Sequence, residues 1–106
     1  MKSVIILSAA LVLALIAGAS AFFGDAGEDH GKEVYAMQKC ALCHSISGIG
    51  GKKQSLDGVG SRLKPEDIKK WIRTPKDMKA DTTMKAYPNL PEKDLGDLTL
   101  YLMTLK

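Results

Sequence analysis

The chain has 106 residues, of which 45% are hydrophobic and 25% charged, and its formal net charge is +3. This length provides one small domain with a single hydrophobic core and leaves no room for a second domain. So small a net charge, without alternating aromatic and basic residues, argues against nucleic-acid binding. Only two cysteines occur, both within one short stretch, which excludes a scaffold built on several disulfides.

An apolar segment comes first. Lys2 supplies one positive charge, residues 4–17 are uncharged and strongly apolar, and residues 19–21 read Ala-Ser-Ala. This order of a basic start, an apolar run and an A-x-A site is typical of a secretory signal peptide. We therefore expect residues 1–21 to be removed on export, which leaves residues 22–106 as the mature domain in the periplasm.

The same segment allows a second interpretation. Residues 4–23 are 20 residues without a charge, which is the length that a helix needs to span a bilayer. If it were not cleaved, this segment would anchor the domain to the inner membrane. The A-x-A site and the absence of a basic stop signal favour cleavage, so we expect membrane association only if the segment is retained.

A helix is predicted next, over residues 27–37. Asp25, Glu28 and Asp29 lie near its start, where the helix dipole favours negative charge. This helix delivers the chain to the two cysteines.

Cys40, Cys43 and His44 form the pattern C-x-x-C-H, which is the attachment signature of covalently bound haem. Two thiols with two residues between them can each add to one vinyl group of the same porphyrin. The adjacent imidazole can then bind the iron. We therefore expect one haem c per chain, attached through both cysteines, with His44 as one iron ligand.

Two other uses of a C-x-x-C pair fit less well. Thiol oxidoreductases carry it after a strand in a βαβ unit, whereas the residues before Cys40 predict a helix. A structural zinc site needs four Cys or His ligands. Outside the motif only His30 remains, in an acidic stretch that we expect to be exposed surface.

The rest of the chain predicts two helices and two loops. Residues 45–61 are rich in glycine and predict a loop; a helix follows from Pro65 until Pro75 ends it, and residues 75–88 predict a second loop. A last helix is expected from about Pro91 to the end. Its apolar face has spacings of three, four and three residues and consists of Leu95, Leu98, Leu102 and Leu105. No segment has the period of two that marks a strand, so the predicted fold class is all-α.

Together with the C-x-x-C-H motif, several stretches resemble the small class I bacterial cytochromes c. The matching stretches are residues 31–35, 56–62, 71–75, 83–87 and 97–102. The resemblance covers nearly the whole mature chain and implies the cytochrome c fold, in which the first and last helices cross around one covalently bound haem. It further implies a crossing at which Gly31 and Tyr35 meet Leu98 and Tyr101.

Two positions depart from the family's pattern. Gln54 stands where the family has a proline whose carbonyl accepts the Nδ1 proton of the haem histidine, and Lys85 stands where a proline follows the axial methionine. A backbone carbonyl at residue 54 can still accept that proton, but a loop with glutamine is less rigid than one with proline and fixes the orientation of His44 less firmly.

The sixth iron ligand is expected to be a methionine. Met37 and Met103 fall on predicted helices, where methionine is more often a packing residue, which leaves Met78 and Met84 in residues 75–88. Met78 follows the helix too closely to turn over a porphyrin. Met84 follows two threonines, near the Thr-x-Met position of the family's ligand. We therefore predict Met84, with Met78 as the alternative.

Iron held between histidine and methionine has a raised reduction potential and no open position for a substrate. No pair of nucleophile and base, and no pair of carboxylates, suggests other catalysis. Together with the resemblance, this predicts a one-electron carrier between redox proteins and not an enzyme. The alternatives are a haem sensor or peroxidase-like protein with a weak or absent sixth ligand, and a membrane-anchored subunit of a larger redox complex.

Two further side chains are candidates for the haem propionates. The resemblance implies Trp71, through its indole N–H, and the charge of Arg62 suits the other propionate. Basic residues also gather in residues 37–53 and 62–85, around the motif and the methionine segment. This predicts redox partners with an acidic docking surface, although a solvated mixed surface without a docking role remains the other interpretation.

Overall fold

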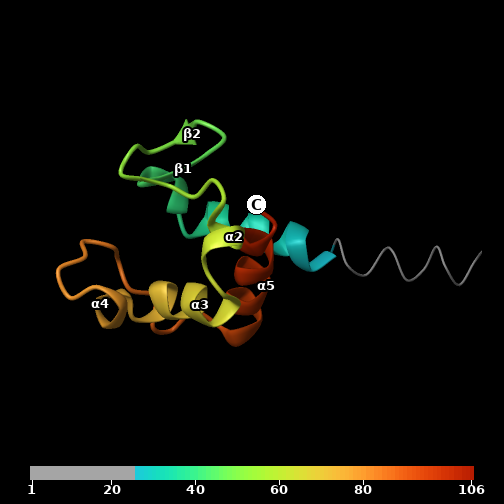
Figure 1. The fold of residues 1–106 in the computed structure, drawn as a ribbon. Coiled ribbons are helices and arrows are strands. Elements are labelled where there is room, and N and C mark those ends of the chain that lie inside the picture. Colours follow the sequence, from blue (N-terminus) through green and yellow to red (C-terminus); the bar gives the residue numbers. More distant parts are fainter. Residues whose placement is uncertain (1–25) are drawn as a thin grey trace, which may run out of the picture.

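The computed structural model describes residues 26–106. Residues 26–37 form a first helix, and the later elements are η1 (Cys40–Leu42), β1 (His44–Ile46), β2 (Ile49–Gly50), β3 (Gln54–Ser55), α2 (Val59–Arg62), α3 (Pro65–Arg73), α4 (Pro75–Met78) and α5 (Glu92–Met103) (Figure 1). Among the described residues, no helix is both long and apolar enough to cross a membrane. The predicted signal peptide at residues 1–21 and the alternative anchor at residues 4–23 lie outside this range.

Helix α3 forms where the sequence predicts it. Pro65 occupies its first turn, where the missing N–H removes no hydrogen bond. Ile68 and Ile72 recur four residues apart, so both fall on one face and both are buried. Pro75 ends the helix as expected, but it also begins α4, which lies in residues 75–88 that we expected to be a loop. The same proline that stops one helix suits the first turn of the next.

The prediction that residues 45–61 are only a loop is wrong. Strand β1 pairs antiparallel with β2 and parallel with β3, in the strand order β2-β1-β3. Ser47 and Gly48 form the turn between β1 and β2 with φ values of 51° and 78°, as two-residue hairpins require. Strands of two or three residues are too short to show alternation, and the turn residues alone indicate the hairpin.

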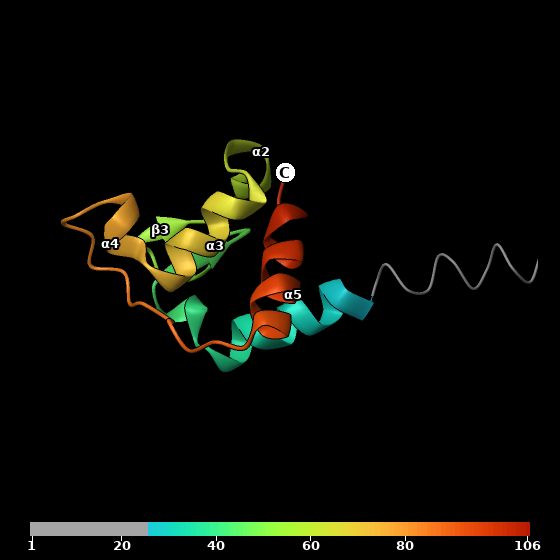
Figure 2. The ribbon, with the colours of Figure 1, turned by 90° about the horizontal axis from the view of Figure 1, so that it is seen from below.

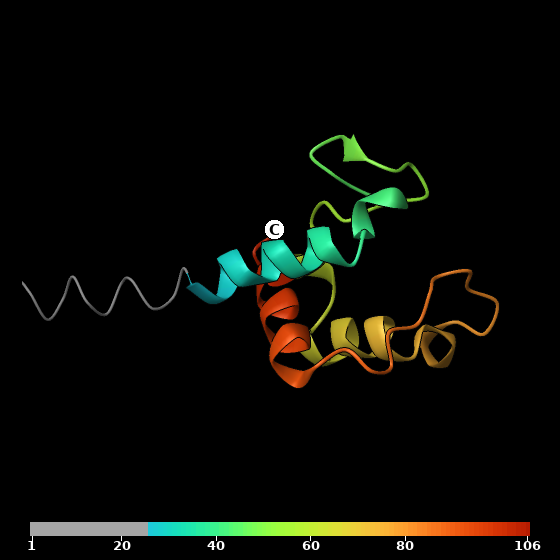
Figure 3. The ribbon, with the colours of Figure 1, turned by 180° about the vertical axis from the view of Figure 1, so that it is seen from behind.

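The first helix and α5 cross, as the resemblance implied (Figure 2, Figure 3). Gly31 lies at the crossing point: a Cβ atom there would run into the carbonyl oxygen of Asp97 and come within 2.7 Å of the Tyr101 Cβ. The rings of Tyr35 and Tyr101 meet edge to face, with centroids 6.0 Å apart, and Leu98 is buried beside them. Only glycine permits so close an approach of two helix backbones at this position.

Polar side chains flank the crossing. His30 Nδ1 lies 2.7 Å from the Asp97 carboxylate, which also accepts a 2.9 Å hydrogen bond from Lys93 Nζ. The hydrogen bonds from Lys93 and His30 hold the pKa of Asp97 below its ordinary value. The expectation that His30 is exposed surface is therefore wrong, because its side chain is half-buried against α5.

Helix α5 ends at Met103 instead of continuing to the last residue. The chain turns there because the Leu105 carbonyl accepts a hydrogen bond from the Gly60 N–H at 2.8 Å. Lys106 Nζ in turn donates to the Gly60 carbonyl at 3.2 Å. These bonds join α2 to the C-terminal end of α5.

One hydrophobic core lies between the first helix, α3 and α5. Its buried members are Val34, Val59, Ile68, Ile72, Leu90, Leu95, Leu98 and Leu102. Leu95, Leu98 and Leu102 form the predicted apolar face of α5. Leu105 packs against this core only in part, because it lies beyond the end of the helix.

Replacing Gly31 by Val should reduce the free energy of unfolding by about 1–3 kcal/mol or more, because the added side chain would force the two helices apart. The matched control is Gly96→Ala on α5, where an added Cβ meets no atom within 4 Å. This control should stabilise the protein by about 0.5–1 kcal/mol through helix propensity. Urea unfolding of both haem-loaded variants, followed by far-ultraviolet circular dichroism, measures the difference. Equal stability of the two variants would contradict the tight crossing.

Candidate haem-binding site

The C-x-x-C-H motif begins two residues after the first helix. Lys39 has a positive φ of 59°, which turns the chain out of that helix and into η1. The Cys43 N–H donates to the Cys40 carbonyl at 3.3 Å and so fixes the spacing of the two cysteines. Both thiols are free; Cys40 is half-buried and Cys43 exposed. Burial raises the pKa of the Cys40 thiol.

His44 is oriented by the small sheet. It begins β1, and the parallel pairing with β3 sets it opposite Gln54. Its Nδ1 lies 3.1 Å from the Gln54 carbonyl oxygen. A carbonyl can only accept, so Nδ1 carries the proton and Nε2 keeps a lone pair for a metal. The carbonyl of residue 54 thus accepts this proton although the family's proline is missing.

Two glycines hold the hairpin against the motif, and sequence reasoning did not single them out. The Gly51 N–H donates to the Ala41 carbonyl at 2.7 Å, and a Cβ on Gly51 would collide with the backbone of Leu42. A Cβ on Gly50 would collide with the His44 carbonyl. The density of glycine in this segment was the available signal, because it marks backbone that approaches other backbone closely.

Met84 and Met78 lie in different local structures. Met84 is half-buried in a stretch without helix or strand between α4 and α5, and its N–H donates to Thr82 Oγ1 at 3.2 Å. Met78 is the last residue of α4. The α4–α5 loop and the glycine-rich hairpin extend on the same side of the crossed helices (Figure 1, Figure 3). Met84 and the motif are thus carried by neighbouring extensions of the fold.

Trp71 and Arg62 lie on different helices. Trp71 is half-buried on α3, and its indole N–H makes no hydrogen bond to any described residue. Arg62 ends α2 and donates from Nη1 to the Asp57 carbonyl at 2.6 Å, which braces the turn before that helix. The guanidinium keeps further N–H groups that this bond does not use.

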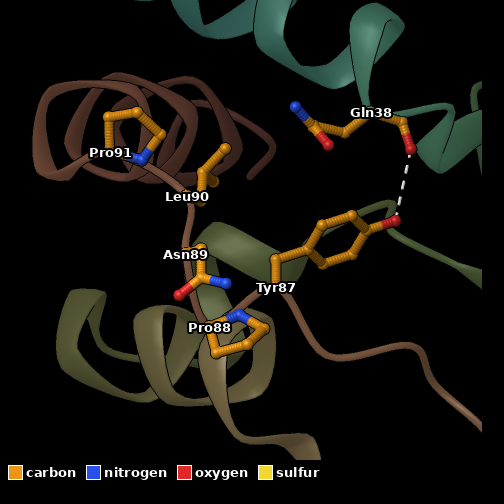
Figure 4. A pocket seen from close by; sticks show the side chains of 6 residues that line it. All are labelled: Gln38, Tyr87, Pro88, Asn89, Leu90 and Pro91. Carbon is orange, nitrogen blue, oxygen red and sulfur yellow. Dashed lines mark hydrogen bonds between the residues drawn. The ribbon is translucent and has the colours of Figure 1, made fainter.

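Sequence analysis did not identify Tyr35 and Tyr87, two tyrosines near the cysteines, as site residues. Burial, with a contribution from Cys40, raises the pKa of Tyr35 to about 12, and its hydroxyl is buried without a partner among the described residues. Tyr87 lines a pocket of about 280 Å³, and its hydroxyl donates to the Gln38 carbonyl at 3.2 Å (Figure 4). Burial, and then the charges of Cys40 and Cys43, raise the Tyr87 pKa as well.

Comparison with known proteins decides the family. Residues 28–106 match the family described as cytochrome c. The chain belongs to the cytochrome c family. The all-α class and the cytochrome c fold predicted from the sequence are thereby confirmed, and the cytochrome carries haem c, bound covalently.

The cytochrome is similar to a curated protein from Alkalihalophilus pseudofirmus, cytochrome c oxidase subunit 2. The two are 30% identical over 88 residues, which cover 74% of this chain and 25% of the relative. This chain therefore spans about a quarter of the length of the relative that it matches. No solved structure gives a significant match.

The described residues fit a covalent haem. Two free thiols lie one turn apart, and the adjacent imidazole has its Nδ1 satisfied by a carbonyl and its Nε2 free for iron. Within residues 26–106, no group of three or more His, Cys, Asp or Glu side chains is placed to hold a metal ion.

Proposed function

We propose that the cytochrome is an exported one-electron carrier in which Cys40 and Cys43 hold the haem by thioethers and His44 and Met84 ligate the iron. The observation that carries the proposal is the 3.1 Å contact between His44 Nδ1 and the Gln54 carbonyl. This contact leaves Nε2 in the tautomer that binds metal and makes it a stronger donor. When bound in this way, haem iron supplies reversible one-electron chemistry without an open position for substrate.

The methionine that completes the coordination is Met84 and not Met78. The backbone of Met78 is fixed at the end of α4 by the hydrogen bond from the Lys79 N–H to the Pro75 carbonyl, 3.0 Å long. Met84 belongs to a stretch without helix or strand, and in this proposal that stretch reaches across a porphyrin face. Its thioether sulfur, a soft ligand, stabilises reduced iron and raises the potential.

Trp71 and Arg62 serve the haem propionates in this proposal. The Trp71 indole N–H makes no hydrogen bond to the described residues, so it is available as a donor to a carboxylate. Arg62 donates one N–H to the Asp57 carbonyl. Its other guanidinium N–H groups can donate charge-assisted hydrogen bonds to a propionate.

Replacing Met84 by Ala tests the sixth ligand. The variant should lose the weak far-red absorption band of sulfur bound to oxidised iron, its potential should fall, and the reduced form should bind carbon monoxide. Met78→Ala is the matched control and should change none of these. If Met78→Ala alone abolished the band, the assignment would be wrong. If the unaltered reduced protein bound carbon monoxide readily at neutral pH, a sensor or peroxidase-like function would replace the electron carrier.

The docking surface proposed for the redox partner is basic. Exposed lysines recur along the chain from the start of α3 through α4 to the loop that carries Met84, and comprise Lys64, Lys69, Lys70, Lys76, Lys79 and Lys85. The charge of Arg73 is less available to a partner, because its Nη2 is paired with the Glu92 Oε1 at 2.8 Å. Residues 62–85 hold eight Lys or Arg against four acidic residues and so carry a net positive charge. A net positive segment attracts a partner of the opposite sign, so the proposed partner presents carboxylates.

Electron transfer to such a partner should slow as ionic strength rises above about 0.1 M, where the Debye length falls below about 10 Å. Lys79→Glu should reduce the bimolecular rate at low salt. Lys32→Glu on the first helix, with the same change of net charge, should reduce it much less. Stopped-flow mixing with an acidic redox protein measures both rates. A rate independent of salt, or equal effects of the two variants, would support a surface without a docking role.

A second candidate function is that of a subunit anchored in the membrane by residues 4–23. The observation that favours it is the similarity to a cytochrome c oxidase subunit 2. We expect instead that the mature protein begins at Phe22 and is recovered in the periplasmic fraction. Intact-mass measurement and carbonate washing of membranes decide between the two. A mass that includes residues 1–21, together with retention in washed membranes, would establish the anchored subunit.

A further inference from the structure

The stretch around Met84 is tied to the rest of the protein at its C-terminal side. Before Tyr87, its hydrogen bonds among the described residues are local: the Thr82 N–H donates to the Lys79 carbonyl at 3.1 Å, and the Met84 N–H to Thr82 Oγ1 at 3.2 Å. Such local bonds shape the loop and do not hold it against another element. The first residue after Met84 that bonds to a distant element is Tyr87.

Tyr87 makes two such bonds to two different elements. Its N–H donates to the Ile72 carbonyl of α3 at 2.9 Å, and its hydroxyl donates to the Gln38 carbonyl, just beyond the first helix, at 3.2 Å (Figure 4). The Gln38 carbonyl is one of the terminal helix acceptors that lack a partner within the helix. The Lys85 ammonium lies 5.2 Å from the centre of the Tyr87 ring and covers one face of it.

These two bonds differ in what they fix. The bond to Ile72 joins the loop to α3, the helix that comes before α4 in the chain. The hydroxyl bond instead joins residue 87 to residue 38, across 49 positions of sequence. Gln38 lies two residues before Cys40, and Tyr87 lies three residues after Met84. The Tyr87 phenol therefore links the segment that carries the haem attachment to the segment that carries Met84.

We propose that Tyr87 is a positioning residue. Its hydroxyl bond to the Gln38 carbonyl, called the latch below, holds the Met84 loop (residues 79–91) against the haem-attachment segment (residues 38–44) and thereby keeps the methionine sulfur on the iron. This inference rests on the proposed ligation by Met84. Opening the loop requires the hydroxyl bond to break, so the bond lowers the fraction of molecules in which the sulfur has left the iron. Tyr87→Phe keeps the ring, its packing and the bond to Ile72, and removes the latch alone.

Binding of imidazole to the oxidised haem-loaded protein tests the latch, because imidazole can take only the position that the sulfur vacates. Loss of one partly buried neutral hydrogen bond should raise the imidazole association constant of Tyr87→Phe by about two- to tenfold. The far-red band should also disappear at a lower urea concentration than in the unaltered protein, ahead of the loss of helical circular dichroism. This separation of the two transitions is a readout that a purely structural role would not produce.

Tyr101→Phe is the matched control, since it also removes one phenol hydroxyl but lies at the helix crossing. It should leave imidazole binding unchanged. Unchanged binding in Tyr87→Phe, or an equal rise in Tyr101→Phe, would overturn the latch. If Met84→Ala abolishes the band and Tyr87→Phe still binds imidazole as the unaltered protein does, only the latch fails. If Met84→Ala leaves the band in place, the ligation proposal fails and the latch with it.

Discussion

The contact of the first helix with α5 at Gly31 determines where the functional parts of the molecule lie. Gly31 has no Cβ atom, and a Cβ atom there would strike the backbone at Asp97. The two helices can therefore approach closely, and Val34 and Leu98 are both buried. The first helix then ends at a defined point and turns through Lys39 into the cysteine motif. The Gln38 carbonyl, just beyond the same helix, accepts the hydrogen bond from the Tyr87 hydroxyl, so the loop that carries Met84 is joined to the end of this helix as well.

The motif, the crossing and the two long helices could be predicted from the sequence because each is encoded locally or by a strong pattern. Residues 40–44 specify the attachment chemistry by their order alone. Leucines at helical spacing identify the buried face of α5, and prolines mark both ends of α3. The crossing followed from a resemblance carried by Gly31 and Tyr101. The close contact between the helices supplies the physical reason for that glycine.

The remaining features depend on contacts between distant residues that no local pattern records. Strand β3 exists because residue 54 reaches the backbone of residues 43 and 44, and two residues are too few to show a period. His30 reads as an exposed residue among acids, yet α5 brings Asp97 to its ring. Tyr87 reads as one more aromatic residue of a loop. Its hydrogen-bond partner is the backbone carbonyl of Gln38. Every residue has such a carbonyl, so the sequence does not indicate which one Tyr87 binds.

The junction also bears on how quickly the chain can fold. The hydrogen bond between His30 and Asp97 joins residues 67 positions apart, so the element on which the others depend is among the last that a diffusing chain can find. Closing so long a loop costs conformational entropy before any contact compensates for it, and folds dominated by distant pairs form slowly. Thioethers at Cys40 and Cys43, as proposed, join residues only three positions apart and leave this long loop open. The chain therefore has to find the crossing through the contacts at Gly31 themselves.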